Sequence, residues 1–94
     1  MVKAKTFPVV VTTAHRGVFF GYATTDEGTD LLLERARMCL YWHESVRGVF
    51  GLAVSGPRSA TRVGPEVTRL RVQGVVSVAH VTPEAEAAWL KAGW

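Results

Sequence analysis

Apolar and polar positions alternate in the first half of the chain as they do in β-strands. Val9 to Thr13 is rich in β-branched residues, and Val18 to Thr25 is aromatic and strand-like. The residues between them, His15-Arg16-Gly17, predict a hairpin turn. After a polar turn over Asp26 to Asp30, the alternation resumes and runs from Leu31 to Trp42. We therefore expect a three-stranded antiparallel meander, with the start of the third strand paired to the second.

Within the third strand, Arg35 and Arg37 share a face with Leu33 and Cys39 by simple alternation. We expect these arginines to pair with acids on the surface or at a contact between subunits. Cys39 stands beside apolar residues, where a small buried hydrophobe is far more common than an activated nucleophile.

The middle of the chain changes to helical spacing. Apolar residues recur three and four positions apart between Val46 and Ser55, and Gly56-Pro57 stops the pattern. The spacing predicts a short helix, and a glycine-rich β turn is the competing interpretation. Gly48, Gly51 and Ser55 form a stripe of small residues along the predicted helix, at a cost of roughly 1 kcal/mol per glycine. Because a close contact must offset that cost, we predict that these three residues form an oligomer interface.

The last third of the chain predicts strands followed by a helix. Alternation returns from Arg69 to Val81, and Gly74 marks a bulge or bend within it. Thr82-Pro83-Glu84 has an N-cap hydroxyl, a proline at the first helical position and an acid near the positive end of the helix dipole. We expect this helix to run to about Ala92, anchored by Trp89.

These elements predict an α+β fold in one small domain that spans residues 1–94. We expect a strongly curved antiparallel sheet or partly open barrel of about five strands, a short middle helix and a C-terminal helix. Hydrophobic residues make up 48% of so short a chain, which is typical of proteins that cover part of their surface with copies of themselves. We therefore expect a homo-oligomer.

The formal charge of +3 rests on eight arginines and three lysines against eight acids. Arginine is the residue that interfaces and phosphate sites favour. The excess is mild compared with the dense basic stripe of a duplex binder, so nucleic acid is an allowed partner but not the favoured one. The single cysteine fits a reducing cytoplasm, and no segment predicts a signal peptide or a membrane span, so we expect a cytoplasmic protein.

Five motifs in this order give the chain a resemblance to a known family: HRGVFFGY, ARMCLYW, RGVFGLAVSGP, RVGP and TPEAEAAW. From Val9 to Trp94 the sequence resembles a family of small uncharacterised proteins of tailed bacteriophages and prophages. The resemblance implies no activity, catalytic residue or cofactor. It implies a phage accessory protein that binds or blocks host machinery, in counter-defence or regulation.

The spacing of acids and histidines argues against catalysis. His15, His43 and His80 lack the paired spacing of metal ligands, and no cysteine pair exists to bind zinc. Most acids belong to the polar turn or the last helix start, and the remainder are best explained as ion-pair partners of arginine: Glu34, Glu44 and Glu66. We therefore expect no enzyme, no metal and no cofactor.

The arginines of the second half are the candidate ligand-binding residues. Arg58 and Arg62 lie in a loop between Gly56 and Pro65, where main-chain donors also favour anion capture. Two more arginines project from the polar face of the next strand, and two aromatic residues can stack a base: Arg69, Arg71, Tyr41 and Trp42. An arginine face that pairs with acids of an adjacent subunit is an equally good interpretation.

Two functions remain. The first is a non-enzymatic homo-oligomer that captures a small phosphate-bearing ligand, such as a nucleotide signal, at subunit interfaces and so acts as a counter-defence sponge. The second is a small-barrel interaction module that binds single-stranded RNA or assembles with a host or phage protein. Arginines concentrated in one loop favour the first, whereas arginines spread along one continuous face favour the second.

Overall fold

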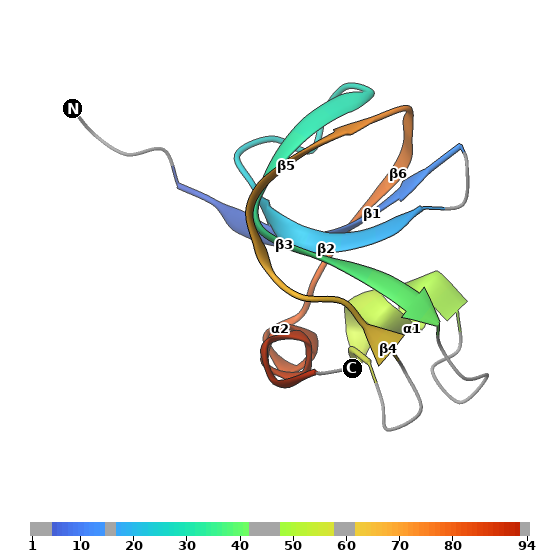
Figure 1. Cartoon of the computed structure of the whole chain (residues 1–94), viewed down its shortest axis with the longest axis vertical. Helices are drawn as coiled ribbons and strands as arrows, with labels where there is room; N and C mark the ends of the chain where they lie inside the picture. Colours follow the sequence, from blue (N-terminus) through green and yellow to red (C-terminus); the bar gives the residue numbers. More distant parts are fainter. Residues whose placement is uncertain (1–4, 15–16, 42–47, 58–61, 93–94) are drawn as a thin grey trace.

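The computed structural model describes residues 5–14, 17–41, 48–57 and 62–92. This described part contains six strands and two short helices (Figure 1). In chain order they are β1 (Phe7–Thr13), β2 (Val18–Ala23), β3 (Asp30–Tyr41), α1 (Gly48–Val54), β4 (Arg62–Val63), β5 (Val67–Gln73), β6 (Val75–His80) and α2 (Pro83–Lys91). The predicted meander, the C-terminal helix and the α+β class are confirmed. The predicted middle helix is confirmed in part, over Gly48–Val54.

The six strands form one antiparallel sheet in the order β4-β3-β2-β1-β6, and β5 also pairs with β3. Strand β3 is long enough to pair with β5 over Asp30 to Ala36 and with β4 at Cys39 and Tyr41. Figure 1 shows the sheet curling on itself, with β5 and β6 meeting at one corner. That corner is Gly74, whose φ of 71° suits glycine. In the described part no pairing joins β5 to β6, so the barrel is not closed.

A bulge in β3 overturns one expectation about side-chain direction. Tyr22 pairs with Glu34 whereas Phe20 pairs with Arg37, so β3 has one extra residue in this stretch. Arg35, within it, adopts a φ of 51°, which is uncommon for a residue with a side chain. The bulge breaks the alternation, so Leu33 and Cys39 belong to different cores. The expectation that Arg35 and Arg37 share a face with both was therefore wrong.

The sheet buries apolar residues on both faces. The core inside the curl consists of Val9, Val11, Ala23, Leu31, Leu33, Ala36, Val72 and Val75. The core on the outer face, under the helices, consists of Val10, Val18, Phe20, Cys39, Leu52, Ala53, Val63, Ala85 and Trp89. Trp89 is fully buried and stacks on Phe20 with ring centroids 4.9 Å apart, which confirms it as the anchor of α2. Cys39 is a buried residue of this second core, as predicted.

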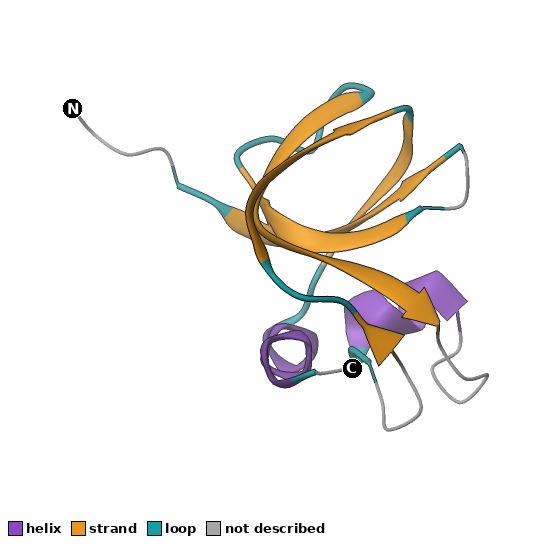
Figure 2. Ribbon diagram, in the orientation of Figure 1, coloured by secondary structure: helices purple, strands orange, loops and turns teal. Residues whose placement is uncertain are grey.

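The two helices lie side by side below the curl (Figure 2) and are joined through the carboxyl end of α1. A seven-residue helix leaves its last carbonyl groups without helical partners. Three of these carbonyl groups accept hydrogen bonds from the α2 segment. The Trp89 indole N–H donates to the Leu52 carbonyl at 3.0 Å. The Thr82 N–H donates to the Ala53 carbonyl at 3.0 Å, and the Thr82 hydroxyl donates to the Val54 carbonyl at 2.7 Å. Thr82 also caps α2, since its Oγ1 accepts from the Ala85 N–H at 3.1 Å.

Gly56 ends α1 in the left-handed region, with a φ of 82°. A Cβ at this position would lie 2.6 Å from the Ala88 Cβ and 2.9 Å from the Ala85 carbonyl oxygen. The close contact of α1 with α2 therefore depends on a glycine just after the helix. No helix in the described part is long and apolar enough to cross a membrane.

Candidate functional site

The candidate arginines lie along the edge of the sheet formed by β4 and β5. Arg62 does not lie in a loop, as expected, but on strand β4, because it pairs in register with Tyr41 near the carboxyl end of β3. Arg69 and Arg71 pair with Glu34 and Leu32, nearer its amino end, and both are exposed as predicted. Arg58 and Trp42 lie outside the described residues.

These positions are too far apart within one chain to surround one phosphate. Tyr41 and Glu34, the register partners of Arg62 and Arg69, are seven residues apart on β3, which corresponds to roughly 20 Å along a strand. Arg71 is also engaged, because its Nη1 lies 3.5 Å from Asp30 Oδ2. Arg69 forms no hydrogen bond or ion pair with another described residue. The described arginines thus follow one continuous edge, and their role in ligand binding stays a prediction.

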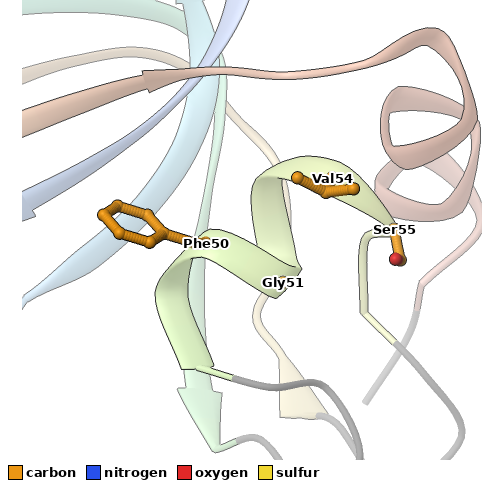
Figure 3. Close-up of a pocket in the computed structure, with 4 residues that line it drawn as sticks. All are labelled: Phe50, Gly51, Val54 and Ser55. Atoms are coloured by element: carbon orange, nitrogen blue, oxygen red, sulfur yellow. The ribbon is translucent and has the colours of Figure 1, made fainter.

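The predicted interface residues Gly51 and Ser55 line a hollow on the exposed side of α1 (Figure 3). Phe50 and Val54, one helical turn apart, also line this hollow, and its volume is about 380 Å³. Phe50 is 76% exposed and Val54 57% exposed. Gly48 is the first residue of α1. We call Phe50, Gly51, Val54 and Ser55 the α1 face.

A second hollow, of about 350 Å³, lies where α2 meets the outer face of the sheet. It is lined by Thr6, Tyr22, Glu34, Arg35, Thr68 and Glu86. The Tyr22 hydroxyl donates to Glu86 Oε2 at 2.5 Å, and the Arg35 guanidinium lies 5.7 Å from the centre of the Tyr22 ring. Arg35 also pairs with Glu66 at 3.4 Å. The predicted pairing of Arg35 with an acid on the surface is thereby confirmed.

Sequence reasoning missed this hollow because neighbours in a regular strand point to opposite faces. The bulge in β3 brings the side chains of Glu34 and Arg35 to the same hollow, and no glycine marks the bulge in the sequence. Burial, followed by the hydrogen bond to Glu86, raises the pKa of Tyr22 from 10.0 to about 12. At neutral pH the hydroxyl is therefore a hydrogen-bond donor, which suits a contact that holds α2 on the sheet.

Arg37 has a structural role that the sequence did not reveal. Its Nε donates to the Gly64 carbonyl at 2.9 Å and its Nη1 to the Trp89 carbonyl at 2.8 Å, so it joins β3 to the β4–β5 connection and to α2. Among the described residues, two backbone acceptors take the place of the expected acid on the surface, and a contact of Arg37 between subunits stays a prediction. The Gly64 carbonyl comes within reach because β4 pairs with β3, and the Trp89 carbonyl because α2 packs against the sheet.

His80 contacts an aromatic ring and a carboxylate. Its ring stacks on Phe7 at 4.9 Å between centroids, and its Nε2 lies 2.9 Å from Asp26 Oδ2. Among the described residues, no three His, Cys, Asp or Glu side chains gather where they could hold a metal ion. His15, His43 and Glu44 lie outside the described residues.

One comparison with known proteins places the chain in a family. A family model described as a domain of unknown function (DUF6948) matches residues 6–89. No curated protein and no solved structure matches the chain.

Proposed function

We propose that this chain, a member of the DUF6948 family of unknown function, is a non-enzymatic interaction module that assembles with copies of itself through the α1 face. The observation that carries the proposal is the composition of α1. Its sequence, GVFGLAV, contains no polar side chain, and a helix that is apolar on all sides is normally buried on all sides. In the single chain, Leu52 and Ala53 are buried whereas Phe50 and Val54 are exposed.

The shape of the α1 face supports a second copy as the occupant. Gly51 and Ser55 leave a hollow beside two large apolar side chains, so Phe50 of one copy fits against Gly51 of the other. Full burial of a Phe or Val side chain contributes about 1.5 to 3 kcal/mol. Two copies of Phe50 and Val54 therefore offer several kcal/mol towards association.

Sedimentation at micromolar concentration tests the proposal with three variants. Phe50→Asp places a charge on the α1 face, and Gly51→Leu fills the hollow, so both should lower the assembled mass. Leu32→Asp is the matched control, because Leu32 is also exposed, at 46%, but lies on β3. A monomeric wild-type protein, or a Phe50→Asp variant of unchanged mass, would contradict the proposal.

Capture of a phosphate-bearing ligand is the second candidate, and the Arg69 guanidinium, which pairs with no acid among the described residues, favours it. Thermal-shift measurements with mono-, di- and cyclic nucleotides test it, with Arg69→Ala as the variant that should lose the stabilisation. Single-stranded RNA is less favoured, because Asp30, Glu34 and Glu66 lie beside the arginines and repel a polyanion. The sequence analysis also predicts a phage origin and a cytoplasmic location. If both predictions are right, a host or phage protein is a further candidate partner.

A further inference from the structure

The second hollow, where α2 meets the outer face of the sheet, lies at the bulge in β3. In a regular strand the side chains of Glu34 and Arg35 would point to opposite faces, but both line this hollow. Arg35 adopts a φ of 51°, in a region that a residue with a side chain enters only at a cost. Bulges and residues of this kind are over-represented beside binding and active sites, because they redirect a side chain. Here the bulge places an acid and a base side by side.

The two acids of the hollow have acceptor oxygens that no described side chain uses. Glu34 is half-buried and forms no hydrogen bond or ion pair with another described residue, its register partner Arg69 included. Glu86 is also half-buried, and it accepts from the Tyr22 hydroxyl through Oε2 only. A carboxylate that is partly removed from water favours a cationic hydrogen-bond donor. These oxygens can therefore accept from an ammonium group of a ligand.

Arg35 supplies the donors of the hollow. Its Nε and Nη2 lie 3.5 Å and 3.4 Å from the carboxylate oxygens of Glu66, whereas no described acceptor engages its Nη1. The guanidinium carbon lies 5.7 Å from the centre of the Tyr22 ring, which holds the group beside the hollow. Because a guanidinium has five N–H donors, Arg35 can bind a ligand carboxylate through Nη1 while it still faces Glu66.

We propose that this hollow binds a small zwitterion, with its ammonium group at Glu34 and Glu86 and its carboxylate group at Arg35. The volume of about 350 Å³ lies within the range of small-molecule sites. A phosphate fits less well, because the two lining acids repel an anion that has no cationic group. A divalent metal also fits less well, because in the described part no three His, Cys, Asp or Glu side chains gather to hold one. The hollow and the α1 face share no lining residue, so this site is independent of the assembly proposed above.

Titrations followed by two-dimensional proton–nitrogen NMR test the site, because the spectrum shows that the protein is folded and which amides respond. The probes are glycine, γ-aminobutyric acid and ε-aminocaproic acid, which carry the two charged groups at increasing separation. At least one of them should shift the amide signals of Glu34, Arg35 and Glu86 in a saturable way. Ethylamine and acetate carry one group each, so they should bind about tenfold more weakly or worse, because each lacks a charge-assisted contact.

Two variants remove the two ligand partners one at a time. Glu34→Gln removes the charge that faces the ammonium group and keeps the shape of the side chain. Arg35→Gly removes the guanidinium at a position whose φ of 51° suits glycine, so the fold should be retained. Each should weaken binding of the zwitterion about tenfold or more. Glu27→Gln and Arg71→Gln are the controls, because both change the net charge equally at exposed positions outside the hollow, and both should bind like the wild type.

A lack of saturable shifts with all three zwitterions up to about 10 mM would overturn the proposal. Shifts confined to the α1 face would overturn it too, and so would equal affinity for a zwitterion and for ethylamine or acetate. Binding that neither Glu34→Gln nor Arg35→Gly weakens would show that another surface holds the ligand. A wild-type protein that is monomeric would contradict the α1 proposal but would leave the expected result of these titrations unchanged.

Discussion

Replacing Thr82 by alanine tests whether one hydroxyl joins the two helices. The Thr82 Oγ1 accepts from the Ala85 N–H at 3.1 Å and donates to the Val54 carbonyl at 2.7 Å, so alanine removes both bonds. Loss of an N-cap typically costs about 1 kcal/mol. The bond to Val54 lies at the surface, where water replaces it, and contributes about 0.5 to 1 kcal/mol. The expected loss of unfolding free energy is about 1.5 to 2 kcal/mol.

Calorimetry measures this loss directly. For a domain of this size, 1 kcal/mol shifts Tm by roughly 4 to 8 °C, so Thr82→Ala should melt roughly 6 to 16 °C below the wild type. Thr82→Ser keeps the hydroxyl and loses a methyl group, so its Tm should stay close to that of the wild type. If the alanine and serine variants melt at the same temperature, the hydroxyl does not join the helices and the reasoning fails.

Two further predictions concern the contacts of α2. Gly56→Ala should lower the free energy of unfolding by about 2 to 4 kcal/mol in urea titrations, because the new Cβ would lie 2.6 Å from the Ala88 Cβ. Gly28→Ala is the control, because Gly28 also has a positive φ, of 90°, but a Cβ there would meet nothing within 4 Å. Gly28→Ala should therefore lower the free energy of unfolding less than Gly56→Ala. Equal losses would show that α2 does not constrain Gly56. Tyrosine absorbance should show Tyr22 ionising near pH 12, and Glu86→Gln should lower that pKa. Because folding raises the pKa of Tyr22 from 10.0 to about 12, the free energy of unfolding should fall as pH rises between these values. Ionisation of Tyr22 near pH 10 would contradict the hydrogen bond to Glu86.

Local patterns were enough to predict the elements except β4, whose two residues lie in the segment that was expected to be a loop. Alternation identified β1, β2 and β3, the Gly56-Pro57 pair marked the end of α1, and Thr82-Pro83 marked the start of α2. These signals succeed because capping, turn conformation and the direction of successive side chains depend on a few neighbouring residues. The buried state of Cys39 and the anchoring role of Trp89 followed from the same local reasoning.

Contacts between distant segments decided the rest. The bulge at Arg35 depends on how β3 must pair with β2 and β5 together, and no residue in its own stretch announces it. The acceptors of Arg37 belong to residues 27 and 52 positions away, so only the pairing of β4 with β3 and the packing of α2 on the sheet bring them within reach. The sequence by itself therefore determined which segments are helices and strands, whereas the tertiary structure decided which of their surfaces remain available to a partner.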